Sequence, residues 1–330
     1  MRVAVIGAGA VGGTIAALLH RAGHEVDVTA RGDNLRALQE RGLHLTGAWG
    51  NHVAPVAAAE RLGRPPELAF VTAKIADADD AMSGSAGYLR GIPVVVVQNG
   101  LDGVRGARRV LPHSDVVGAL ALFAASLVRP AEVTVTAAAE TILGVPGAAP
   151  TIPVLTARDL LDPVLPVRVT GNFAGAQWTK LVINEVNALP AITGLSVQAT
   201  LADPRLRAVV TRSMQETVRV AAAAGVRFDP ISGLGNAALR AFGHLPVRLA
   251  QAVPARMARR MGATPNPGST LQSIRRGRPT EIDGLSGAVV AEAARLGVTA
   301  PVNAALVAMV HEVEASSTHL STAEVLRRVG

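Results

Sequence analysis

The rarity of lysine marks one stretch of this sequence for chemistry. The chain of 330 residues holds 32 lysines and arginines, and Lys74 and Lys180 are its only lysines. Lys180 lies in the apolar run 175–190, whose periodicity predicts a helix. At about 100° per residue, Lys180, Asn184 and Asn187 fall within an arc of about 60°. Apolar side chains cover most of the remaining circumference, so this polar stripe is predicted to face a cleft rather than bulk water.

A lysine beside an apolar surface can do what an arginine cannot. The free ammonium group has a pKa of about 10.4, and partial desolvation lowers that value until the group releases its proton near neutral pH. A guanidinium group stays charged under the same conditions. Lys180 is therefore predicted to be a proton donor in catalysis, with an ordinary surface lysine as the alternative.

A second group of polar residues lies at 267–283. Ser269 and Thr280 each fit the first position of a capping box, which would place Glu281 in the first turn of a helix. The helix dipole favours a carboxylate there, and the carboxylate could accept a hydrogen bond from a substrate hydroxyl. The local sequence leaves open whether these residues cap helices or bind a substrate.

The first residues predict a dinucleotide site. A β-branched strand at 2–6 precedes a glycine-rich turn, and an apolar helical run at 15–19 follows it. This is the GxGxxG pattern between a strand and a helix. We expect Gly7 to permit the tight turn, Gly9 to let a pyrophosphate approach the backbone, and Gly12 to let the helix pack on the strand. The residues predicted to bind the cofactor here are Gly7, Ala8, Gly9, Ala10, Val11 and Gly12.

The next strand, at 25–29, is followed by Arg31, where an NAD-binding fold usually places a carboxylate on the ribose 2′-hydroxyl. An arginine at this position can pair with a 2′-phosphate. The cofactor is therefore predicted to be NADP, as NADPH, rather than NAD. A surface arginine in an arginine-rich chain is the alternative.

Two further strands, at 68–72 and 93–97, are predicted to be buried in a parallel sheet. Lys74 follows the first strand, and Asn99 follows the second. The carboxyl ends of strands line the ligand crevice of a doubly wound sheet, so both side chains are candidate site residues. For Asn99, which precedes a glycine, an ordinary turn is the alternative.

The remaining pattern sets the predicted fold class and domains. Alternating segments at 133–136 and 167–170 predict antiparallel strands that complete the sheet. From residue 172 the chain changes to long Ala- and Leu-rich helical runs. We predict an α/β protein with an N-terminal Rossmann dinucleotide-binding domain at 1–171 and an all-helical C-terminal domain at 172–330.

Composition excludes several classes of protein. No apolar run approaches the roughly 18 to 20 uninterrupted residues of a membrane-spanning helix, and the glycine-interrupted start does not fit a signal peptide. The net charge of +7 comes from scattered arginines with 2% aromatic residues, a pattern that does not favour nucleic-acid binding. The absence of cysteine excludes disulfides and thiolate metal sites, and no metal site is predicted. We expect a soluble, cytoplasmic protein with a small-molecule partner; whether it forms a homodimer is open.

These motifs resemble those of the ketopantoate reductase (2-dehydropantoate 2-reductase) family, over nearly the whole chain. The matching segments are GAGAVG at 7–12, Arg31, VTAK ending at Lys74, QNG at 98–100, WTKLVIN at 178–184 and SIRRGRPTEID at 273–283. The resemblance implies a Rossmann domain and a helical domain, with NADPH and substrate in the cleft between them, and a place in pantothenate biosynthesis.

The same resemblance implies roles for single residues. Lys180 would be the general acid, and Glu281 would bind a hydroxyl of the substrate. Substrate-positioning groups would be Asn99, Asn184 and Ser269, with Asn187 on the same stripe; Lys74 and Asn99 would also approach the cofactor. The implied reaction is the NADPH-dependent reduction of a 2-keto acid or related carbonyl compound.

Two departures from the family pattern bear on the substrate. The family usually has a second asparagine four residues after the first, followed by Pro-Leu, whereas here Asn187 comes after three and position 188 is alanine. An acid is also common where Ser273 stands. On a regular helix continuing to Pro190, the Asn187 amide would start about 1.5 Å and about 100° from the family's position. Ketopantoate is therefore predicted to be a poor substrate, or to bind through a rearranged Asn187. The alternatives are reduction of a different specialised carbonyl compound and a non-catalytic NADPH-binding sensor.

Overall fold

The computed structural model describes residues 1–262 and 265–329, and its chain forms two compact units. The N-terminal unit comprises Met1–Gln98 and Asp102–Phe173, and the helical unit comprises Asn99–Leu101 and Ala174–Gly330. The chain thus enters the helical unit for the three residues Asn99–Leu101 and returns to the N-terminal unit at Asp102. The prediction from the sequence differs: it assigns Asn99–Leu101 to the N-terminal domain, with the boundary after residue 171.

The N-terminal unit is built on an eight-stranded sheet of order β12-β11-β8-β7-β6-β1-β2-β5. Neighbouring strands run parallel except for β11 and β8. The central strands are buried on both faces, which is why they read as continuous apolar runs. The strands are β1 (Arg2–Ile6), β2 (Glu25–Thr29), β5 (Ala57–Ala59), β6 (Leu68–Val71), β7 (Pro93–Val97), β8 (Asp115–Ala121), β11 (Thr141–Gly144) and β12 (Val167–Val169).

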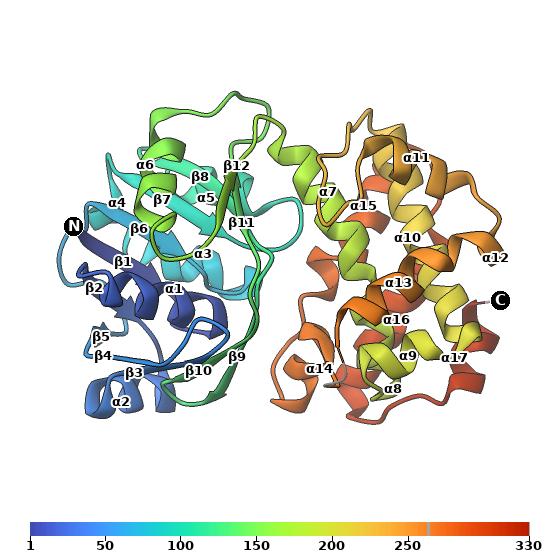
Figure 1. Cartoon of the computed structure of the whole chain (residues 1–330), viewed down its shortest axis with the longest axis horizontal. Helices are drawn as coiled ribbons and strands as arrows, with labels where there is room; N and C mark the ends of the chain where they lie inside the picture. Colours follow the sequence, from blue (N-terminus) through green and yellow to red (C-terminus); the bar gives the residue numbers. More distant parts are fainter. Residues whose placement is uncertain (263–264, 330) are drawn as a thin grey trace. The chain divides into compact units, whose positions relative to one another are not determined.

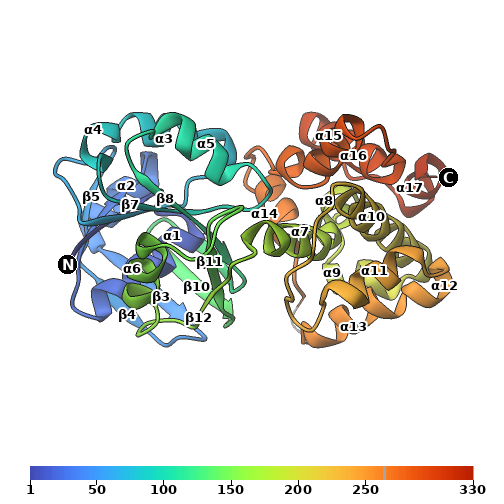
Figure 2. The same cartoon turned by 90° about the horizontal axis from the view of Figure 1, so that it is seen from above.

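Helices cover both faces of this sheet, as the view from above shows (Figure 2). Helices α3 (Ile75–Ser83) and α5 (Gly103–Val110) lie on one face, and α1 (Ala10–Arg21) and α6 (Ile152–Leu161) lie on the other. Two more helices, α2 (Gly32–Arg41) and α4 (Ala86–Leu89), complete the unit. This doubly wound arrangement confirms the predicted Rossmann fold.

A second, four-stranded sheet of order β4-β3-β10-β9 packs against α1. Its strands are β3 (Leu43–Gly47), β4 (His52–Ala54), β9 (Ala124–Arg129) and β10 (Glu132–Ala137). The prediction that 133–136 completes the main sheet is wrong, because these residues lie in β10 of this second sheet. The prediction for 167–170 holds in part: β12 completes the main sheet at its edge and runs parallel to β11, and this pair is antiparallel to β8. Alternation identifies a strand with one buried face, but it does not choose the partner. Here Val133 packs over Gly13 of α1.

The helical unit extends from α7 to α17 (Figure 1). Its centre is α10, which contacts α9, α11, α12, α13, α15, α16 and α17 around a core of Leu, Val, Met and Ala. The elements of the helical unit are α7 (Phe173–Asn184), η1 (Glu185–Asn187), α8 (Ala188–Thr193), α9 (Val197–Ala202), α10 (Pro204–Ala223), α11 (Asn236–His244), α12 (Val247–Ala250), α13 (Ala252–Arg260), α14 (Gly268–Arg275), η2 (Ile282–Gly284), α15 (Ser286–Arg295), α16 (Pro301–Ser316) and α17 (Thr322–Val329).

Among the described residues, no helix combines the length and apolar character needed to cross a membrane.

Candidate active site

The glycine turn joins β1 to α1 as the sequence predicts. A Cβ atom at position 12 would lie 2.2 Å from the Thr72 hydroxyl and 2.3 Å from the Gly7 carbonyl oxygen, so a side chain there would separate the helix from the strands. Gly9 is the residue before α1, and a Cβ built there meets no atom within 4 Å. The backbone at the start of α1 is therefore accessible at Gly9. A helix N-terminus with its N–H groups accessible fits the phosphates of a dinucleotide.

Arg31 lies at the start of α2 and forms an ion pair with Asp80 of α3. Both side chains are more than half exposed, and Asp80 raises the pKa of Arg31. Asp80 is not among the site residues predicted from the sequence, although it lies in the acidic segment Asp77–Asp80. Lys74 is the residue before α3 and is partly buried. A 2′-phosphate bound by Arg31 would have to compete with Asp80.

Helix α7 carries Lys180 and Asn184 among residues that are mostly buried. Lys180 and Asn184 are partly buried, while Leu181 and Val182 are almost fully buried. Burial lowers the pKa of Lys180 to about 8, and the nearby carboxylate of Glu281 opposes part of that shift. The ammonium group thus carries its proton at neutral pH but releases it much more readily than an ordinary lysine.

The segment Asn99–Leu101 is bound to α7. The buried amide of Gln177 donates to the carbonyl oxygen of Gly100 at 3.0 Å and to that of Leu101 at 3.3 Å. Gln177 lies three residues before Lys180, at the edge of the same stripe. One face of α7 therefore both anchors this segment and presents the lysine.

Gly100 brings Asn99 close to Glu281. Its φ is 81°, in the left-handed region, and a Cβ there would lie 2.4 Å from the carbonyl oxygen of Gly284 in η2. This close backbone approach leaves Asn99 Nδ2 at 3.4 Å from Glu281 Oε2. Nothing in the local sequence predicts the pairing of Gly100 with Gly284, because 184 residues separate them along the chain.

Neither of the two possible capping boxes forms. Helix α14 begins at Gly268, whose φ is 73°, so Ser269 is the second helical residue rather than the cap, and it is exposed. Glu281 precedes the three-residue η2 and is not in a helix's first turn. The Thr280 hydroxyl accepts a hydrogen bond from the N–H of Ile282 at 3.3 Å. Since neither Ser269 nor Glu281 is used as a cap, both side chains remain candidates for binding.

The asparagine stripe continues past α7 through a tighter turn. The expected regular helix is interrupted, because α7 ends at Asn184 and η1 is a 3₁₀ turn before α8. Residues i and i+3 eclipse one another in a 3₁₀ helix, so Asn187 follows Asn184 on nearly the same face. Asn187 is partly buried, and a Cβ at Gly268 would lie 2.6 Å from its Oδ1 atom. The 100° displacement was calculated for a regular helix, and the helix is not regular at this point.

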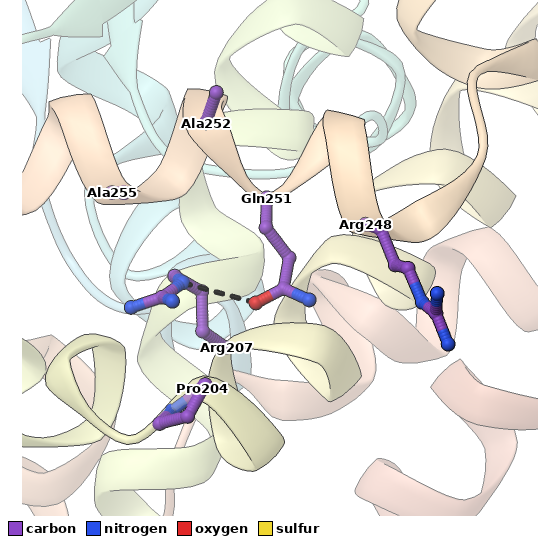
Figure 3. A pocket seen from close by; sticks show the side chains of 6 residues that line it. All are labelled: Pro204, Arg207, Arg248, Gln251, Ala252 and Ala255. Atoms are coloured by element: carbon purple, nitrogen blue, oxygen red, sulfur yellow. Dashed lines mark hydrogen bonds between the residues drawn. The ribbon is translucent and has the colours of Figure 1, made fainter.

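An open hollow of about 420 Å³ elsewhere in the helical unit contains none of these residues (Figure 3). It is lined by Pro204, Arg207, Arg248, Gln251, Ala252 and Ala255. The guanidinium group of Arg207 donates to the Leu201 carbonyl at 2.8 Å and to Gln251 Oε1 at 3.0 Å, so it joins α10 to the junction of α12 and α13. We interpret Arg207 as structural.

Two family models match this chain. The family model described as ketopantoate reductase PanE/ApbA matches residues 3–147, and the one described as its C-terminal part matches residues 172–314. The 2-dehydropantoate 2-reductases of Pyrococcus horikoshii and Archaeoglobus fulgidus are each 26% identical to this chain. Those alignments cover 94% and 95% of this chain, and 96% and 98% of the relatives.

Solved structures agree with the sequence relatives. A PanE/ApbA family ketopantoate reductase from Ralstonia eutropha JMP134 has 28% identity and a TM-score of 0.80, covering 97% of this chain and 100% of that one. A D-mandelate dehydrogenase solved with NADH and anilino(oxo)acetate has a TM-score of 0.81, with coverages of 96% and 99%. Its 19% identity shows a shared fold only.

The N-terminal unit has the doubly wound sheet and glycine turn of a dinucleotide-binding fold, and the curated relatives show that this chain is an oxidoreductase. More narrowly, the chain belongs to the ketopantoate reductase family, because the two models of that family together span most of its length.

Proposed function

We propose that this chain reduces a 2-keto acid or related carbonyl compound with a nicotinamide dinucleotide, and that Lys180 is its general acid. The observation that carries the proposal is the desolvated ammonium group of Lys180. This group lies near the carboxylate of Glu281, and its pKa is lowered to about 8. A bound dinucleotide would supply hydride to the carbonyl carbon. Lys180 would then donate its proton to the oxygen as negative charge develops there.

The surrounding polar groups would orient the substrate. Glu281 would accept a hydrogen bond from a substrate hydroxyl, and Asn99, at 3.4 Å from that carboxylate, would hold its orientation. Asn184 and Asn187 would bind the substrate's polar groups from one face, with Ser269 as a further contact. The relatives' names, 2-dehydropantoate 2-reductases, support a 2-keto acid as the class of substrate.

The glycine turn and Arg31 would hold the dinucleotide, with Lys74 and Asn99 as further contacts. The start of α1 would bind its phosphates, and Arg31 would bind a 2′-phosphate, which favours NADP. The direct test is oxidation of NADPH measured against a panel of 2-keto acids that includes ketopantoate. A chain that binds NADPH but oxidises it with no member of the panel would refute the proposal and favour a sensor.

Arg31→Ala is expected to raise the KM for NADPH by about tenfold or more, with a much smaller effect on NADH, because only NADPH presents a phosphate to the guanidinium group. Asp80→Asn is expected to act in the opposite direction, since it removes the competing carboxylate of the ion pair. Steady-state kinetics with both cofactors measures the two effects. Equal changes for NADPH and NADH in Arg31→Ala would show that Arg31 does not recognise the phosphate.

The pH dependence of reduction should report the titration of Lys180. The proton donor must carry its proton, so kcat should be level below about pH 8 and fall by up to about tenfold per pH unit above it. Oxidation of the alcohol product should show the opposite trend, because it needs the neutral amine. A reduction rate that stays level to about pH 10 would contradict a donor whose pKa is depressed by burial.

Asn187→Ala should lower kcat/KM for the preferred keto acid by about 10- to 150-fold, the usual cost of a lost polar contact in a buried site. The same variant decides whether ketopantoate is that substrate. An ordinary kcat/KM for ketopantoate, about 10⁴ M⁻¹s⁻¹ or above, that does not change in Asn187→Ala would show that Asn187 takes no part in binding it.

A further inference from the structure

A buried carboxyl group lies directly after Asn184 and has no role in the proposed chemistry. Glu185 is 2% exposed and is bound by three hydroxyl groups. Ser213 Oγ of α10 lies 2.6 Å from Glu185 Oε2, Thr217 Oγ1 of α10 lies 3.0 Å from Oε1, and Ser286 Oγ of α15 lies 2.9 Å from Oε2. The three partners are at most 1% exposed. Glu185 therefore joins the end of α7 to two other helices.

Counting hydrogens indicates which form of the carboxyl group fits. Ser213 Oγ also lies 3.0 Å from Asn303 Oδ1, and Thr217 Oγ1 lies 3.1 Å from the Ser213 carbonyl oxygen. The three hydroxyl groups thus make five contacts with acceptors but hold three hydrogens. A proton on Glu185 adds a fourth, because the acid can donate to Ser213 Oγ and leave the serine hydrogen for Asn303. The ionised form would leave two of the five oxygen–oxygen contacts without a hydrogen, whereas the neutral acid leaves one.

The negative charge of a neighbouring carboxylate also favours the neutral form of Glu185. Glu216 of α10 accepts hydrogen bonds from the N–H groups of Val302 and Asn303 at 3.0 and 2.9 Å, and from Asn303 Nδ2 at 2.9 Å. Its carboxylate disfavours a second negative charge nearby. Burial is the main reason that the pKa of Glu185 is raised to about 7; the hydrogen bonds from Ser213, Ser286 and Thr217 oppose the shift, and the charge of Glu216 adds a smaller increase. The groups facing Glu185 from α15 and α16 are the uncharged Ser286 and Asn303.

Glu185 lies where the chain changes from an α-helix to a 3₁₀ turn, directly between the two asparagines of the candidate site. Glu185 is the first residue of η1, where α7 tightens and Asn187 comes onto the face of Asn184. We propose that Glu185, as a neutral carboxylic acid held by Ser213, Thr217 and Ser286, is a positioning residue that fixes this turn and so presents Asn184 and Asn187 together to the substrate. The inference rests on the proposed function, because it assumes that the two amides bind substrate.

The kinetic test compares two substitutions at Glu185. Glu185→Ala is expected to raise the KM for the preferred 2-keto acid about tenfold while kcat and NADPH affinity change little, because the amides lose their fixed arrangement. Glu185→Gln should restore the KM, since its amide N–H replaces the acid O–H. In the wild type the KM should rise above about pH 7, and in Glu185→Gln it should stay level. This limb differs from that of Lys180, which affects kcat.

Two further variants keep the test decisive. If Glu185→Ala fails to fold, Ser286→Ala takes its place. It removes one hydrogen-bond donor to Glu185 and is expected to raise the KM by a smaller factor. Leu239→Ala, in the buried core of α11, should lower the melting temperature and leave the KM unchanged. A KM that rises equally in Leu239→Ala would mean that any loss of stability has this effect, and it would overturn the inference.

Thermal unfolding tests the neutral carboxyl group without substrate. Its folded-state pKa is raised, so the wild type should be most stable relative to Glu185→Gln below about pH 4.5 and lose that advantage as the pH rises through about 7. A melting-temperature difference that does not change with pH would overturn the neutral form. Reduction of keto acids with no change of KM in Glu185→Ala or Ser286→Ala would overturn the positioning role alone. Absence of any reduction, with normal NADPH binding, would refute the proposed function and the positioning role with it.

Discussion

Replacing Lys180 with alanine is expected to lower kcat by about 10²- to 10⁴-fold, the range for loss of a general acid. NADPH affinity should stay close to that of the wild type, because Lys180 belongs to the helical unit and the glycine turn to the N-terminal unit. Single-turnover reduction of a 2-keto acid at pH 7 measures the loss without interference from product release.

Lys180→Arg provides the control that separates charge from proton transfer. Arginine keeps a positive charge beside Glu281 but does not release a proton near neutral pH. We therefore expect this variant to be nearly as impaired as Lys180→Ala. Turnover close to that of the wild type would mean that position 180 supplies only charge, and the rarity of lysine in the chain would need another explanation.

Gly100→Ala is expected to lower kcat/KM by about 10²-fold, a loss typical of a misplaced site group. The added methyl group would meet the Gly284 carbonyl oxygen at 2.4 Å, so the segment that carries Asn99 has to move away from Glu281. Steady-state reduction of the same keto acid measures the effect.

Gly91→Ala is the matched control for this substitution. Gly91 also has a left-handed φ, 75° compared with 81° at Gly100, but a Cβ there meets no atom within 4 Å. Both variants bear a similar backbone strain of about 1 to 2 kcal/mol, and only Gly100→Ala has the clash. Equal activity in the two variants would show that the close approach of Gly100 to Gly284 has no part in the site.

The sequence predicts the central sheet well because burial on both faces leaves a local trace. Pro93–Val97 is a continuous apolar run, and the glycine turn after β1 has a spacing that few other structures need. Partner choice leaves no such trace. The segment 133–136 has the pattern of a half-buried strand in either sheet, and its pairing with β3 and β9, which are distant in the sequence, assigns it to the second one.

The candidate site divides in the same way. The chemistry of Lys180 could be predicted because helical periodicity and residue type are both local. Its proximity to Glu281 could be proposed only by family resemblance, since about a hundred residues separate them in the sequence. The 3₁₀ turn at Glu185 could not be predicted from propensity, because contacts with α10 and α15 hold it. A regular helix was the natural expectation, and tertiary hydrogen bonds overrode it.

Because Asn99–Leu101 belong to the helical unit, this chain can exchange parts with relatives by recombination only in certain ways. A fragment that begins at Ala174 would leave the buried amide of Gln177 without the carbonyls of Gly100 and Leu101, at a cost of about 1 to 3 kcal/mol. A chimera joined at residue 173 would pair the Gln177 of one parent with the loop of the other. Genetic crossovers between relatives should therefore be tolerated only when this three-residue loop is inherited together with the helical unit, although 72 residues of the other unit lie between them in the gene.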